Sequence, residues 1–283
     1  MGGAALAGAS VPPIIATARP IWTVVAGEAL TRTGHALNAA LADAAQITSP
    51  LMVAGVALLV SAEFALALLV AGAVSAAGMV AVGTDGGAPP APPPSHLRRA
   101  PRFRAGLRAI VIGDLALGAW TAGLEVTVTA AAASRGVAEL AAVPLTASAF
   151  GSIAVSLWSG TGRSTRPPAW RYLGGWSIVV MCLPFTLLAS SVAAWAVVLV
   201  VVGAGFGLLN VAVFELLDHL APPARAAEAF TWLTTANAAG TAVGAAACGR
   251  LAQTGTRASL VLVAGFAGAG TVIAVSRRGA LRQ

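Results

Sequence analysis

Long apolar runs, separated by short polar breaks, repeat along the chain from about residue 36 almost to its C-terminus. Most of the runs are about twenty residues long, and a helix of that length crosses the hydrocarbon core of a bilayer. Helices satisfy their own backbone hydrogen bonds in lipid, whereas a barrel would need short alternating strands. The pattern therefore predicts an all-α polytopic membrane protein with about eight spanning helices. The helices are expected at about residues 36–60, 62–82, 106–132, 138–158, 172–190, 193–217, 226–250 and 257–275.

The composition changes this picture little. Hydrophobic residues make up 58% of the chain and charged residues 10%, and the mean hydropathy is +0.84. A soluble domain carries far more charge, so a water-soluble enzyme is excluded. Cys182 and Cys248 lie inside apolar runs without CxxC spacing, which predicts buried free thiols. No metal and no cofactor is expected.

The placement of the basic residues predicts the orientation of the helices. All seventeen are arginines, so the lysine of a phosphate-binding loop and a lysine Schiff base are both excluded. Fourteen arginines fall on one side of the predicted spans, and Arg135, Arg250 and Arg257 fall on the other. The positive-inside rule then places both termini in the cytoplasm, in a multi-pass protein of the cell membrane. Because the arginines form no basic face on a soluble domain, no nucleic-acid partner is expected.

The longest break, GTDGGAPPAPPPSHLRRAPRFR, covers residues 83–104. Its proline run favours an extended tether, and its basic end predicts a cytoplasmic linker. Two spans precede this segment and six follow it. The sequence therefore predicts three parts: residues 1–82, a linker at 83–105, and a six-helix bundle at 106–283.

Several segments resemble helices of the major facilitator superfamily, in particular its drug-efflux-like transporters. Residues 114–136 and 146–163 resemble that family's seventh and eighth helices, and 203–255 its tenth and eleventh. Before the linker, residues 11–22 are similar to the end of a fourth helix and 36–59 to a fifth. The family's signature loop between its second and third helices has no counterpart. The resemblance thus implies a complete second half and a first half that begins in the fourth helix.

The resemblance implies a permease that moves a small-molecule substrate across the cytoplasmic membrane by alternating access, in contact with the lipid bilayer. Coupling to H⁺, as in an efflux antiporter, stays open, since Ser49-Pro50 stands where antiporter members carry Gly-Pro. The alternative is a truncated remnant that does not transport. An enzyme is not expected, because no HExxH or GxSxG motif occurs.

Three acidic residues lie inside predicted spans. A charge in the bilayer costs about 2.5 to 3.5 kcal/mol on insertion scales, so Asp43, Asp114 and Glu125 are candidates for a proton or cation pathway. Asp114 and Glu125 are eleven residues apart and share one helix face with Gly118. Asp43 forms an i, i+3 pair with Gln46. The alternative is structural, namely a protonated carboxyl group that bonds a neighbouring helix.

The predicted span at 226–250 carries a stripe of polar side chains. Thr234, Asn237 and Thr241 follow i, i+3 and i+7 spacing. The resemblance implies a substrate site at this depth, and interhelical hydrogen bonding is the equally weighted alternative. Asn210 and Trp120 are further candidates for the lining of the pocket.

Two other patterns predict packing and surface charge. Gly240 and Gly244 form a GxxxG motif, which indicates close helix packing. Glu215 lies near the cytoplasmic end of its span, where pairing with Arg225 in a solvated ion network is the favoured interpretation. The other members of that network would be Asp218, His219 and Glu228.

Overall fold

Every regular element that the structure describes is a helix. The computed structural model describes residues 101–160, 166–189, 191–221 and 225–281, together with isolated positions between 37 and 78. The long helices are α4 (Pro101–Ser134), α5 (Ala142–Gly160), α6 (Pro168–Leu188), α7 (Val192–Leu220), α8 (Ala226–Thr254) and α9 (Thr256–Ser276). A 3-10 turn, η1 (Ala138–Ala141), precedes α5, and a short α10 (Arg278–Leu281) follows α9. The all-α prediction is confirmed for these residues.

Local sequence explains where several helices begin and end. Ser191 precedes α7, and its hydroxyl accepts a hydrogen bond from the Ala194 amide at 3.1 Å, as expected of an N-cap. Pro168 opens α6, where its missing N–H costs nothing. Gly255 separates α8 from α9 with a φ of +152°, which other residues rarely adopt, so the chain turns sharply there.

Five of the described helices are long and apolar enough to cross a membrane: the segments Ala105–Ser134, Ala142–Ser159, Pro168–Leu188, Val192–Leu220 and Thr256–Ser276. The chain is therefore a multi-pass membrane protein by helix length and hydropathy, in contact with the lipid bilayer. The predicted span at 226–250 is a helix, α8, but its threonines and Asn237 make it less apolar than these five, so its crossing of the membrane stays a prediction. The predicted spans at 36–60 and 62–82 lie largely outside the described residues, so a total of eight stays a prediction.

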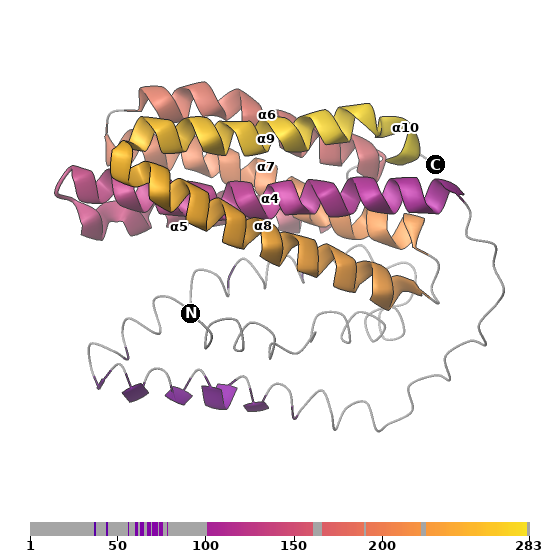
Figure 1. Cartoon of the computed structure of the whole chain (residues 1–283), viewed down its shortest axis with the longest axis horizontal. Helices are drawn as coiled ribbons and strands as arrows, with labels where there is room; N and C mark the ends of the chain where they lie inside the picture. The colour runs from indigo at the N-terminus through magenta and orange to yellow at the C-terminus, as the bar shows by residue number, and fades with distance from the viewer. Residues whose placement is uncertain are drawn as a thin grey trace. The chain divides into compact units, whose positions relative to one another are not determined.

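Helices α4 and α8 form a tight parallel pair. A Cβ atom added at Gly240 would meet the Leu115 carbonyl oxygen, and one at Gly244 would meet that of Ala119. From α4, a Cβ at Gly118 would meet the Asn237 carbonyl oxygen. The two backbones therefore approach so closely that only glycine fits, which is the packing that small-xxx-small motifs produce in membranes. In Figure 1, α8 slants across α4.

Helices α5 and α7 form a second parallel pair of the same kind. Added Cβ atoms at Gly203 and Gly207 would meet the backbone of Ser148 and Ser152. The other extensive interfaces join α6 to α7 and α4 to α9. Trp176 of α6 is fully buried, and its ring lies against Gly270 of α9.

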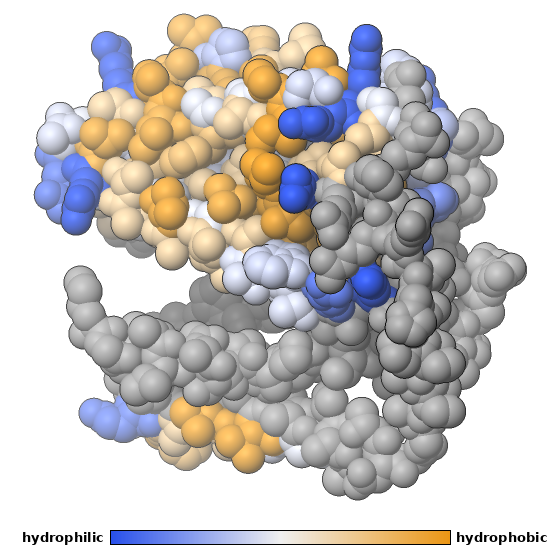
Figure 2. All heavy atoms as spheres, turned by 45° about the vertical axis from the view of Figure 1, so that its right-hand side comes forward, coloured by the Kyte–Doolittle hydropathy of each residue, from blue (hydrophilic) through white to orange (hydrophobic). Residues whose placement is uncertain are grey.

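Large apolar side chains cover much of the outside of this bundle. Several are more than 60% exposed, namely Phe150, Met181, Leu188, Val197 and Val272. Figure 2 shows hydrophobic residues over much of the visible face, with hydrophilic ones mainly toward its edges. A soluble protein rarely exposes so much contiguous apolar surface, whereas lipid solvates it well.

The chain divides into two compact units. One comprises Met1–Thr31 with Ala45–His96, and the other Arg32–Ala44 with Leu97–Gln283. Helices α4 to α10 belong to the second unit. The predicted boundaries at 1–82, 83–105 and 106–283 stay a prediction.

Candidate functional site

Asp114 is a buried acid within a spanning helix. It lies nine residues after Ala105, where the apolar part of α4 begins, and so about 14 Å into that span. Only 7% of its surface is exposed. A carboxyl group at this depth needs polar neighbours or a proton, because lipid compensates neither its charge nor its hydrogen bonds.

The neighbours of Asp114 come from α8 and α6. The Asn237 side-chain amide of α8 donates to the Asp114 backbone carbonyl at 3.4 Å. The Tyr172 hydroxyl of α6 lies against Gly113, next to the acid. Trp176 packs edge-on against Tyr172, with ring centroids 6.4 Å apart. Within the described part of the chain, the Tyr172 hydroxyl and the Trp176 ring N–H are buried without a hydrogen-bond partner.

Thr234, Asn237 and Thr241 form a row of polar side chains along α8, which we call the polar strip. Asn237 is half-buried beside Asp114, whereas Thr234 and Thr241 are exposed. The Thr234 hydroxyl donates within its own helix, to the Phe230 carbonyl at 3.2 Å. The polar strip combines donors and acceptors along about 10 Å of helix, so it can bind a polar solute or pair with another polar helix.

Glu125 does not share the burial of Asp114. It is exposed on α4, although the eleven-residue spacing places both acids on one face. Sharing a face does not fix burial, because the neighbours differ along the helix: the Tyr172 side chain reaches α4 beside Asp114, at Gly113. The structure therefore does not bring the two acids into one buried site.

The remaining predicted residues are scattered. Trp120 is buried between α4 and α7, where its ring lies 6.1 Å from that of Phe206. Asn210 is half-buried on α7. Asp43 and Gln46 lie outside the described residues. Gly240 and Gly244 lie against the backbone of α4 and take no part in the polar strip.

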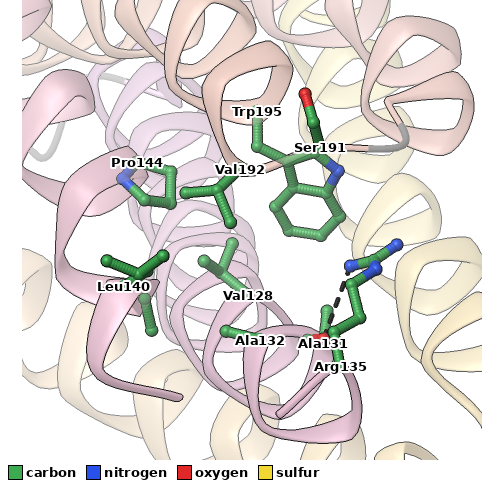
Figure 3. A pocket seen from close by; sticks show the side chains of 10 residues that line it. Val128, Ala131, Ala132, Arg135, Leu140, Pro144, Ser191, Val192 and Trp195 are labelled. Carbon is green, nitrogen blue, oxygen red and sulfur yellow. Dashed lines mark hydrogen bonds between the residues drawn. The ribbon is translucent and has the colours of Figure 1, made fainter. Parts of the chain in front are cut away.

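A shallow groove lies where the end of α4 meets η1 and the start of α7 (Figure 3). Its walls are mostly apolar, and Arg135 is the charged residue among those that line it. The Arg135 guanidinium lies over the Trp195 ring, 5.9 Å from the ring centroid. Sequence reasoning used Arg135 only to orient the helices and did not predict this groove.

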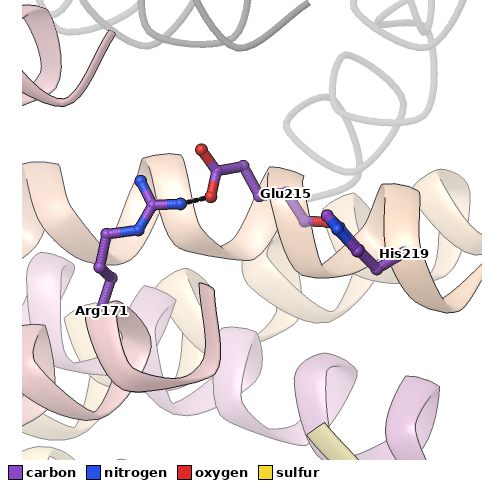
Figure 4. A network of polar contacts seen from close by, with 3 residues as sticks. All are labelled: Arg171, Glu215 and His219. Carbon is purple, nitrogen blue, oxygen red and sulfur yellow. Dashed lines mark hydrogen bonds and ion pairs between the residues drawn. The ribbon is translucent and has the colours of Figure 1, made fainter. Parts of the chain in front are cut away.

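A buried ion pair joins α6 to α7, and the sequence interpretation of its members was wrong. Glu215 pairs with Arg171, and both side chains are at least nine-tenths buried (Figure 4). The prediction that Glu215 pairs with Arg225 in a solvated network is therefore wrong, because Glu215 is buried and pairs with Arg171. The His219 ring contacts the Glu215 backbone carbonyl at 2.7 Å. The remaining members of the expected network, Asp218, His219 and Glu228, are exposed.

The signal that could have found this pair is Pro167-Pro168. A proline at the first helical position marks a helix start, and α6 begins at Pro168 rather than at residue 172. Arg171 then falls within the first turn of α6 instead of in a loop. Inside the bundle, an arginine needs an acidic partner, because an unpaired buried charge is very costly.

A second buried cluster joins α4, α8 and α9. The hydroxyl groups of Thr127 and Ser259 lie 2.5 Å apart, and the Ser259 hydroxyl donates to the Cys248 carbonyl at 3.2 Å. Cys248 is a buried free thiol, and Cys182 is half-buried and free. Among the described residues, no three side chains of His, Cys, Asp or Glu lie close enough together to hold a metal ion.

Comparison of the chain with protein-family models and with curated proteins found no match in either case. The family therefore stays a resemblance carried by individual helical segments of the sequence. The chain is an all-helical, multi-pass membrane protein with five described helices fit to span a bilayer.

Proposed function

We propose that this chain is a transporter of the major facilitator type, which moves a small solute across the cell membrane by alternating access. One observation carries the proposal: a buried carboxyl group, Asp114, lies well inside a spanning helix, beside the polar strip of α8. Transporters commonly bind substrates and coupling ions near the midplane, between helices. A buried acid that served only packing would carry a large free-energy cost.

The arrangement of helix pairs supports the same proposal. The six long helices form two consecutive sets of three, in which α4 corresponds to α7, α5 to α8 and α6 to α9. Under this correspondence the α4–α8 pair matches the α7–α5 pair, and the α6–α7 interface matches the α9–α4 interface. Each of these interfaces is among the most extensive in the unit. The helix directions agree, since both pairs are parallel and both interfaces are antiparallel. Three-plus-three repeats of this kind build each half of a major facilitator transporter.

In this proposal Asp114 binds the coupling proton or a cationic group of the solute, and the polar strip contacts the solute's hydrogen-bonding groups. No covalent chemistry is involved, so the protein is not an enzyme. The arginine distribution supports a cell-membrane location with both termini in the cytoplasm.

The test is uptake of a small amphiphilic cation, ethidium, into proteoliposomes that contain the full chain and carry a proton gradient. We expect saturable uptake that falls more than tenfold in Asp114→Asn. This substitution keeps the size of the side chain and leaves the backbone carbonyl that Asn237 bonds. Asp218→Asn, at an exposed acid near the end of α7, is the matched control and should retain uptake.

Two results would contradict the proposal. Equal loss in Asp114→Asn and Asp218→Asn would mean that uptake depends on overall charge rather than on the buried acid. Absence of uptake for ethidium and for a panel of neutral and anionic solutes, with insertion verified, would contradict transport by this chain.

A further inference from the structure

The groove at the end of α4 combines an apolar wall with one cationic group. Val128 and Ala132 contribute from α4, Leu140 from η1, Pro144 from α5, and Val192 from the start of α7. Arg135 follows directly after Ser134, the last residue of the α4 span. The guanidinium thus lies where the hydrocarbon core gives way to headgroups, and the apolar wall extends from it toward the core.

The ring of Trp195 holds the guanidinium in place. Trp195 is 5% exposed, and its ring N–H donates to the Ala189 carbonyl at 2.9 Å, which fixes the indole. The Arg135 guanidinium lies over this ring, 5.9 Å from its centroid, and donates one N–H to the Ala131 carbonyl at 3.4 Å. A guanidinium has five N–H donors, so several remain for a ligand.

Among the carboxylates whose side chains the structure describes, none forms an ion pair with Arg135, and Arg135 is exposed. The ligand that complements the groove is therefore anionic at one end and apolar at the other. A guanidinium binds phosphate in a bidentate fashion, and the phosphate of a membrane lipid lies at this depth.

We propose that the groove binds one acidic phospholipid of the adjoining leaflet. The phosphate accepts hydrogen bonds from Arg135, and the first part of an acyl chain lies along Leu140 and Val192. The groove lies at the end of α4, whereas Asp114 lies well inside that helix. The lipid site is therefore separate from the proposed solute site, and the proposal does not depend on transport.

The test uses the full chain in detergent micelles, with native mass spectrometry to count bound lipid. Dioleoyl phosphatidylglycerol and dioleoyl phosphatidylcholine are titrated separately. We expect a tight site for one phosphatidylglycerol, weakened about fivefold to tenfold in Arg135→Gln. The controls are Arg250→Gln and Arg257→Gln, exposed arginines at the same end of the bundle that do not line the groove. Both should bind the lipid as the parent chain does.

A second variant separates binding from folding. Val192→Trp fills the groove and keeps Arg135, so it should lose the same lipid. The melting temperature of each lipid-free variant is measured, and phosphatidylglycerol at one fixed concentration should raise that of the parent chain more than that of Arg135→Gln.

Several results would overturn the proposal. They are equal loss in the three arginine variants, unchanged binding in Arg135→Gln, or phosphatidylcholine binding as tightly as phosphatidylglycerol. Displacement of the lipid by millimolar inorganic phosphate would assign the groove to a free anion instead.

Discussion

The two parallel helix pairs of the bundle pack in the same way but treat their polar residues differently. In both pairs glycines allow the backbones to touch, at Gly240 and Gly244 of α8 and at Gly203 and Gly207 of α7. Three of the four α5 serines, Ser152, Ser156 and Ser159, are at most 1% exposed, and Ser148 is half-buried. On α8, Thr234 and Thr241 are exposed.

The two sets of polar residues therefore differ in their surroundings. The serines on one face of α5 lie in a closed contact with α7, where their small size lets the two helices approach closely. The exposed threonines of α8 lie on the outside of the described bundle, and the Thr234 hydroxyl bonds within its own helix. The polar strip is therefore open to a water-filled passage, a solute or another polar surface.

The largest expected effect concerns the buried charges that join α6 to α7. Arg171→Met should lower the free energy of unfolding in micelles by about 3 to 5 kcal/mol, because it leaves Glu215 buried without its partner. The double variant Arg171→Met/Glu215→Leu should recover much of that loss. The measurement is denaturant unfolding followed by tryptophan fluorescence.

Glu228→Gln, at an exposed acid, is the control for Arg171→Met and should change stability by less than about 0.5 kcal/mol. A single Arg171 variant as stable as this control would show that the pair contributes nothing to the fold.

The second prediction is that the α4–α8 and α5–α7 pairs depend equally on their glycine contacts for stability. Gly240→Leu and Gly207→Leu should each destabilise the bundle by about 2 to 3 kcal/mol, since a side chain at either position meets backbone of the partner helix. Gly268→Leu on α9 faces open space and is the control. The measurement is the melting temperature in micelles. If Gly240→Leu were as stable as Gly268→Leu, the close α4–α8 contact would not contribute to stability as the α5–α7 contact does.

Sequence alone predicted most of this architecture and less of its chemistry. The apolar periodicity placed six helices between residues 106 and 275, and the structure has helices there, because lipid forces each run to satisfy its own backbone. The burial of Asp114 was expected from the sequence, because a charge exposed to lipid carries a large free-energy cost. The burial of Arg171 with Glu215 was missed, because the predicted helix began one residue too late to include the arginine.

Other features depend on which helices meet, and no single-helix pattern contains that information. The exposure of Glu125 and the groove at Arg135 arise from neighbours that are distant in the sequence. The polarity of α8 was visible in the sequence, and its crossing of the membrane stays a prediction.

The smallest expected effect on stability is also the sharpest test of the comparison. Single cysteines at Thr241 and Ser156, in a background of Cys182→Ala and Cys248→Ala, should both change stability by less than about 1 kcal/mol. Their reaction with a charged, membrane-impermeant thiol reagent should differ more than tenfold. The thiol at position 241 lies on the exposed side of α8, whereas that at 156 lies in the closed α5–α7 contact. Protection of position 241 to the same degree as 156 would mean that lipid or protein covers the polar strip, and the strip would then be packing surface, as the serines of α5 are. Rapid labelling at 241 that added ethidium slows would instead assign the strip to an aqueous passage that the solute enters.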